Sequence, residues 1–158
     1  MTWTTFHRRG EVLRAVIETV DARRDGRLPM DVPGVAEAFG DELTLLGALQ
    51  LHWHTRLSGR LERALAHGPA DAEATAVAAW CATCDELPGI RMVLDRHRAA
   101  PLDDAMARAS ATAAAKEHVL LAGLSGRAGA TTGATAVAGR ELEERARATR
   151  RTAPHAAA

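Results

Sequence analysis

The run from Glu42 to Ala66 has the clearest helical periodicity in the chain, and it constrains the fold more than any other feature. Its apolar side chains recur every three or four residues, which is the repeat of one face of an α-helix. A helix of this length spans about 38 Å. The predicted inner stripe is Leu46, Leu49, Trp53, Leu57, Leu61 and Ala64, and a flanking stripe is Leu43, Gly47, Leu51, His54, Ser58 and Leu65. Because this apolar sector is wide, we expect two neighbouring elements to cover it.

The rest of the chain also favours helices. The 158 residues include 35 Ala and 19 Arg, which are good helix formers, whereas the β-branched residues Val and Ile are sparse. Helical patterns are predicted at 5–24, at 71–97 and at 101–124, with a short connector helix at 33–39. Pro88 breaks the third pattern, and we expect a new helix to start there with Asp85 as its N-cap. The predicted inner face of 101–124 is Leu102, Met106, Ala109, Ala113, Leu120 and Leu124.

These patterns predict an all-α fold, an up-and-down helical bundle of four main helices, formed by residues 1–125. Residues 126–158 are predicted to form a separate region: a Gly- and Ala-rich linker, an amphipathic helix at 135–151 and a disordered tail from Thr152. The apolar stripe of this last helix is thin, with Val137 and Leu142 as its larger members. It therefore either docks loosely or waits for a partner.

Charge and hydropathy exclude several classes of protein. Lys plus Arg equals Asp plus Glu at 20 each, so the formal net charge is zero and nucleic-acid binding is not expected. No apolar run reaches the 18 residues typical of a membrane span. The first residues lack the basic-then-apolar order of a signal peptide, and there are two cysteines. We therefore expect a cytoplasmic protein with reduced thiols and no membrane association.

Histidine residues supply the first candidate site. His52 and His54 cannot both face one metal ion on a helix, because residues two apart point about 200° apart. His54 lies beside the apolar stripe and is the better candidate, with Trp53 next to it and Glu62 at the rim. His118 could face His54 across the bundle and complete a site for a small ligand, iron or zinc. The alternative is a surface pair of Lys116 and Glu117, with His118 at the boundary of the core.

Iron-binding bundles have recognisable ligand motifs, and the chain lacks them. Ferritin-type bundles use Glu-x-x-His, but Leu49, Leu51 and Ala115 stand three residues before His52, His54 and His118. Hemerythrin-type spacing is also missing, because Arg56 and Ser58 stand four residues after His52 and His54. The layout is similar to these bundles only in its long helix that carries histidine, and no family is identified from it.

Cys81 and Cys84 supply the second candidate site. At three residues apart on a helix, two cysteines lie within disulfide reach and could form a redox couple or half of a metal site. Asp85 and Glu86 follow directly, however, and neighbouring carboxylates raise the pKa of a thiol. Buried structural cysteines are the alternative interpretation.

The leading hypothesis is a small non-enzymatic helical protein that works by association with a second copy, as a homodimer or other homo-oligomer, or with a protein partner. No convergent set of acid, base and nucleophile is apparent, so no catalytic residue is assigned. The second hypothesis is a metal- or small-ligand-binding bundle that uses His54 and His118, with Trp53 and Glu62 nearby. A thiol redox protein that uses Cys81 and Cys84 is the third hypothesis.

Overall fold

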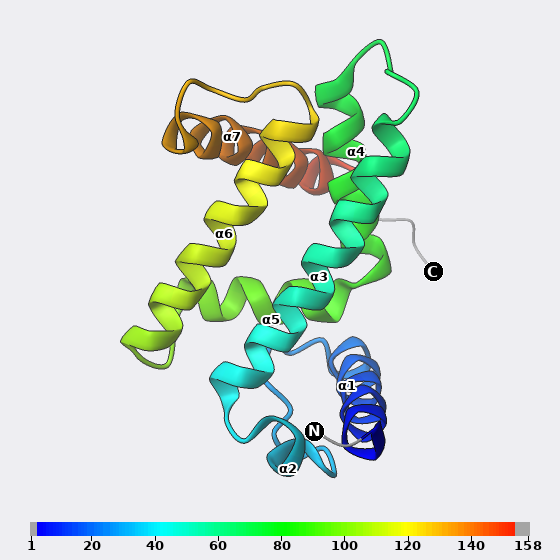
Figure 1. The fold of residues 1–158 in the computed structure, drawn as a ribbon, viewed down its shortest axis with the longest axis vertical. Helices are drawn as coiled ribbons and strands as arrows, with labels where there is room; N and C mark the ends of the chain where they lie inside the picture. Colours follow the sequence, from blue (N-terminus) through cyan, green and yellow to red (C-terminus); the bar gives the residue numbers. More distant parts are fainter. Residues whose placement is uncertain (1–2, 154–158) are drawn as a thin grey trace. The chain divides into compact units, whose positions relative to one another are not determined.

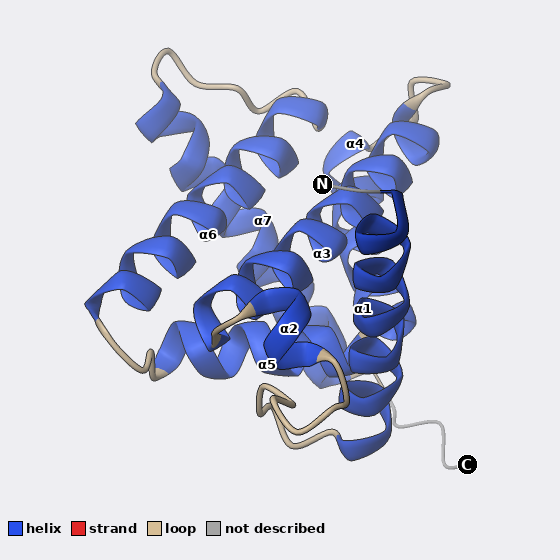
Figure 2. Ribbon diagram, turned by 60° about the horizontal axis from the view of Figure 1, so that its bottom comes forward, coloured by secondary structure: helices blue, strands red, loops and turns tan. Residues whose placement is uncertain are grey.

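The computed structural model describes residues 3–153, and their side chains from residue 8 onward (Figure 1). Within this range every regular element is a helix and none is a strand, as Figure 2 shows. The all-α prediction is confirmed, and the arrangement is compatible with a helical bundle. The helices are α1 (Trp3–Arg23), α2 (Val35–Phe39), α3 (Glu42–Leu65), α4 (Ala72–Glu86), α5 (Pro88–Ala99), α6 (Asp104–Leu124) and α7 (Thr132–Thr152).

The chain divides into two compact units. The first comprises residues 1–54 and 87–113, and the second comprises residues 55–86 and 114–158. The second unit therefore holds α4 and α7 together with parts of α3 and α6. The predicted separation of residues 1–125 from 126–158 stays a prediction.

The first unit is built around the inner stripe of α3, where the side chains of Leu46, Leu49 and Trp53 are buried as predicted. Helix α1 packs against α2 and α5. The contact with α5 depends on Gly89, because a Cβ atom at this position would lie 2.4 Å from the backbone of Val20. The amide of Gly89 donates to the Asp21 carboxylate at 2.7 Å. A side chain at residue 89 would therefore force α1 and α5 apart.

The second unit has a smaller and less apolar interior. Leu57 and Leu61 of α3 are buried, as the periodicity predicted, but Ala64 is exposed. Helix α7 packs against α4. Thr131 caps α7, because its side chain accepts a hydrogen bond from the amide of Ala134. The C-terminal helix is thus longer than the predicted 135–151 and begins at Thr132.

Two local predictions are wrong. Asp85 does not cap α5: it lies in the last turn of α4, and Leu87 precedes Pro88 as the N-cap. The inner face of α6 is also misplaced, since Leu102 and Leu124 are 58% and 39% exposed. Met106 is buried as predicted, and after it the buried positions lie about one residue further along: Ser110, Ala114, Glu117, His118, Leu121 and Ala122.

The predicted disordered tail is described only in part. Residues 154–158, most of the predicted disordered tail, lie outside the described residues. Thr152, where that tail was predicted to begin, is the last residue of α7. None of the helices within residues 3–153 has the length and the hydropathy needed to span a membrane.

Candidate functional site

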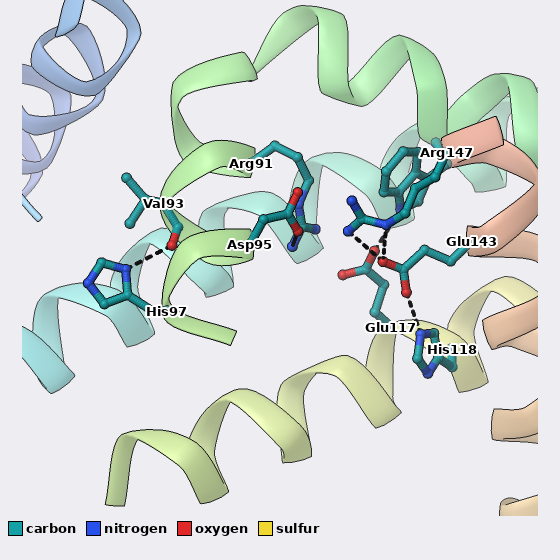
Figure 3. A network of polar contacts seen from close by, with 9 residues as sticks. Arg91, Val93, Asp95, His97, Glu117, His118, Glu143 and Arg147 are labelled. Carbon is teal, nitrogen blue, oxygen red and sulfur yellow. Dashed lines mark hydrogen bonds and ion pairs between the residues drawn. The ribbon is translucent and has the colours of Figure 1, made fainter. Parts of the chain in front are cut away.

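Helices α4, α6 and α7 bring together a polar cluster of five side chains, four of them buried and the last half-buried: Trp80, Glu117, His118, Glu143 and Arg147. All five belong to the second unit. His118 Nε2 lies 2.5 Å from Glu143 Oε2. The other carboxylate oxygen of Glu143 accepts from Arg147 Nε at 2.9 Å and from Arg147 Nη2 at 2.7 Å. Figure 3 shows Glu143 between these two partners.

The indole of Trp80 extends the cluster to α4. Its Nε1 donates to Glu117 Oε1 at 2.7 Å, and the Arg147 guanidinium lies over the indole ring, 5.1 Å from its centre. The guanidinium thus contacts a carboxylate and an aromatic face together, as arginine favours. The cluster therefore links α7 both to α6, through His118, and to α4, through Trp80.

Burial makes these contacts matter. Glu117 and His118 are each 6% exposed and Glu143 is 3% exposed, so water cannot solvate their polar atoms well. A buried charge is tolerated when it is paired and hydrogen-bonded, and costs several kcal/mol when it is not. In this structure each of the three residues has a polar partner within the cluster. This arrangement can hold three helices in one register.

Gly139 allows α7 to approach this closely. A Cβ atom at residue 139 would lie 1.8 Å from the carbonyl oxygen of His118, so α6 and α7 touch backbone to backbone here. Gly139 lies one helical turn before Glu143. The same close approach therefore brings the Glu143 carboxylate within reach of the His118 ring.

Ion pairs surround the cluster at the surface of the second unit. Arg145 of α7 donates to Glu73 of α4 at 2.5 Å. Arg150 of α7 donates to the Asp85 carboxylate and, at 3.1 Å, to the carbonyl of Cys81. Arg127, in the loop before α7, pairs with Glu141 at 3.1 Å. Exposed pairs of this kind contribute little individually, typically about 0–1 kcal/mol each.

The predicted histidine and tryptophan candidates belong to different units, and their common role stays a prediction. His118 lies in the cluster, in the second unit, whereas His54 is half-buried on the part of α3 that belongs to the first unit. Trp53 is a core residue of the first unit, 1% exposed, with the Arg91 guanidinium 4.7 Å from its ring centre. Glu62 is exposed and accepts from Ser58 at 2.9 Å. The predicted surface pair of Lys116 and Glu117 is wrong, because Glu117 is buried.

Cys81 and Cys84 carry thiols, and no disulfide joins them. Cys84 is buried, and the half-buried Cys81 lies at the contact with α7, its Sγ 3.5 Å from the carbonyl of Ala146. Burial raises the pKa of the Cys81 thiol, an effect that the nearby Arg150 opposes and Asp85 reinforces. A raised pKa leaves less thiolate at neutral pH and so slows thiol chemistry. The redox role stays a prediction.

Metal binding also stays a prediction. Among residues 3–153, no three or more His, Cys, Asp or Glu side chains gather in a way that could hold an ion. In the cluster, His118 approaches Glu143 and Glu117 contacts Trp80 instead.

The sequence singled out His118, but it did not indicate that Glu143, Arg147 and Trp80 surround it. One signal was present, because Glu143 and Arg147 are four residues apart and can pair on one helix face. That spacing is also usual on solvated helices, so it could not show that the pair is buried.

The first unit has a shallow groove of about 490 Å³ between α1 and residues 31–33. Arg23 and Asp31 lie at its edge and form a bidentate ion pair. Arg23 Nη1 donates to Asp31 Oδ1 at 2.8 Å, and Nη2 donates to Oδ2 at 2.6 Å. The Arg23 guanidinium lowers the pKa of Asp31 to about 2. The pair is solvent-exposed and fastens the connector before α2 to α1.

Comparisons with models of protein families, with curated proteins and with solved structures find no match to this chain.

Proposed function

We propose that this protein works without catalysis, by association with a second copy of itself. The observation that carries the proposal lies on α3. Residues 43–55 form the longest stretch of the chain without Asp, Glu, Lys or Arg. Within it Thr44, Gly47, Leu51 and Thr55 are nevertheless exposed, and Leu51 is 67% exposed.

The outward side of this stretch forms what we call the α3 outer face: Thr44, Gly47, Ala48 and Leu51. These positions follow the i, i+3, i+4, i+7 spacing of one helix face. Thr44, Gly47 and Leu51 are exposed and Ala48 is half-buried. A single exposed leucine is ordinary on a protein surface, but an exposed helix face without any charge is typical of the centre of an interface. Two members of the flanking stripe that the sequence predicted to be covered, Gly47 and Leu51, are exposed, and its other members are half-buried.

The shape of this face suits a second copy. Gly47 has open space where a Cβ atom would stand, since no atom of this chain lies within 4 Å of that point. In an antiparallel pair of α3 helices related by a two-fold axis between Gly47 and Leu51, each Leu51 side chain faces the other copy's Gly47. A self-complementary face of this kind is what a two-fold dimer requires. The absence of charge gives a charged partner nothing to pair with.

One helix face is smaller than the standard interface of about 1,600 Å², so the proposed dimer is weak and concentration-dependent. In this proposal the protein is cytoplasmic, and the thiols of Cys81 and Cys84 are consistent with a reducing compartment.

The test compares two surface variants by solution mass. Leu51→Arg places a charge in the α3 outer face, and Val137→Arg places the same charge on α7 at a residue that is 48% exposed. We expect Leu51→Arg to remain monomeric at concentrations where the Val137→Arg protein and the unmodified protein dimerise. Equal melting temperatures would show that all three are folded. A Leu51→Arg protein that still dimerises would contradict the use of this face.

A further inference from the structure

The contact that holds α7 to the second unit contains few large apolar side chains. Helix α7 buries Thr135, Ala138, Gly139, Leu142, Glu143 and Ala146, and only Leu142 among them is both large and apolar. Burial of apolar area stabilises in proportion to the area removed from water, so Ala and Gly contribute little. Helix α7 itself therefore contributes little apolar area to the contact, and its polar contacts carry a larger share.

The attraction between these polar groups is largely cancelled by the cost of removing them from water. Removing Glu143, His118 and Arg147 from water costs free energy that their mutual attraction must first recover. The surface pairs, such as Arg145 with Glu73, contribute little and are screened by salt. The docked state of α7 thus depends on specific polar geometry more than on apolar area from α7 itself, and in an undocked state water would solvate the same polar groups.

The connection before α7 allows such a release. Residues 125–131 form a loop with Gly126 at φ +79° and Gly129. Gly126 adopts a left-handed conformation that ends α6, so α6 does not continue into α7 as one rigid rod. When α7 leaves, the groups it covers on α4 and α6 are Trp80, Glu117 and His118. Figure 3 shows how Glu143 and Arg147 lie against His118 and Glu117 in the docked state.

We infer that α7 is a detachable strap, which undocks from α4 and α6 as one unit while α3 stays folded, and so controls exposure of Trp80, Glu117 and His118. Ionic strength shifts the equilibrium between docked and undocked α7, because the ion pairs around the cluster favour the docked state and salt screens them. This inference does not depend on the proposed dimer, since the α3 outer face and the α7 contact share no residue.

Hydrogen exchange of the full chain, followed by mass spectrometry at low and high NaCl, tests the inference. We expect the amides of α7 to exchange together and faster than those of α3. Raising NaCl from about 0.02 M to about 1 M should speed α7 exchange about fourfold, since the two screened pairs between α7 and α4, Arg145 with Glu73 and Arg150 with Asp85, each contribute about twofold. Exchange in α3, whose contacts are apolar, should not accelerate.

A pair of charge-removing variants sharpens the test. Arg145→Gln removes the pair with Glu73, and we expect α7 to exchange about twofold faster at low salt with a reduced response to NaCl. Arg140→Gln is the matched control, because Arg140 is exposed on the same helix and forms no ion pair with any residue that the structure describes. The inference would be overturned if the amides of α7 exchanged no faster than those of α3. It would also be overturned if NaCl had no effect on exchange in α7. An equal effect of the two variants would overturn it as well.

Discussion

Glu143 is the least exposed charged residue in the described part of the second unit. A single carboxylate with 3% exposure contacts the His118 ring with one oxygen and the Arg147 guanidinium with the other. Its neighbour Glu144 has the same chemistry but is exposed. The two residues therefore separate the effect of a buried charge from that of a charge on the same helix.

Replacing Glu143 by Gln keeps the shape of the side chain and removes its charge. We expect Glu143→Gln to lower the free energy of unfolding by about 1–2 kcal/mol, because it weakens the charge-assisted hydrogen bonds from the half-buried Arg147. Glu144→Gln should change it by less than about 0.5 kcal/mol. Urea unfolding of both variants measures this difference. Equal stabilities would show that the cluster is not a main support of the second unit.

Cys81 gives a prediction that depends on pH. Burial raises the pKa of its thiol, so the reactive thiolate forms only at higher pH than in an ordinary cysteine. In a Cys84→Ser background we expect iodoacetamide to label Cys81 slowly at neutral pH and faster as the pH rises. Rapid labelling of native protein at neutral pH would contradict the raised pKa and favour the redox hypothesis.

At the scale of single residues, the sequence indicates which side chains can carry chemistry but not which of them meet. His118 could be singled out because it lies among Ala and Leu on a helix. Its partner Glu143 is 25 residues away, and no local pattern indicates that separation. Glu117 seemed a surface residue because charged side chains are seldom buried, and burial is possible here because Trp80 donates a hydrogen bond to it.

The helices themselves differ in how well periodicity predicts them. In α3 the buried positions match the predicted stripe over most of its length, since large apolar residues mark it. In α6 the stripe is rotated by about one residue, because the inner face holds Ser110, Glu117 and His118 and the apolar Leu102 and Leu124 lie outside. Alanine occurs on all sides of this helix and cannot indicate which face is buried.

Helix contact also depends on glycine, and this gives a prediction for α7. Gly139→Ala places a methyl group against the His118 carbonyl, so we expect it to destabilise the second unit and to speed α7 exchange. Gly10→Ala on α1 is the control, because a Cβ atom there meets nothing within 4 Å. A glycine in an exposed helix costs about 1 kcal/mol relative to alanine, so the control should stabilise. A lower melting temperature for Gly139→Ala and a higher one for Gly10→Ala would support the close contact of α6 with α7. A higher melting temperature for Gly139→Ala would contradict it.

For the whole molecule, composition predicted the helical class correctly because it sums many weak preferences over the chain. The assignment of α7 to the same compact unit as α4 could not be predicted in this way. It depends on pairings between distant residues such as Arg145 with Glu73 and Arg150 with Asp85. The same limit applies to function, since a face open for association is recognised only after the chain's own contacts are known.

Self-association through the α3 outer face is the central claim, and solution mass against concentration tests it most directly. Sedimentation equilibrium of the unmodified chain, over about a thousandfold range of concentration, spans the micromolar-to-millimolar affinities of weak dimers. We predict that the average mass rises from 16.8 kDa toward twice that value as the concentration increases. A mass that stays at 16.8 kDa over the whole range would contradict the claim.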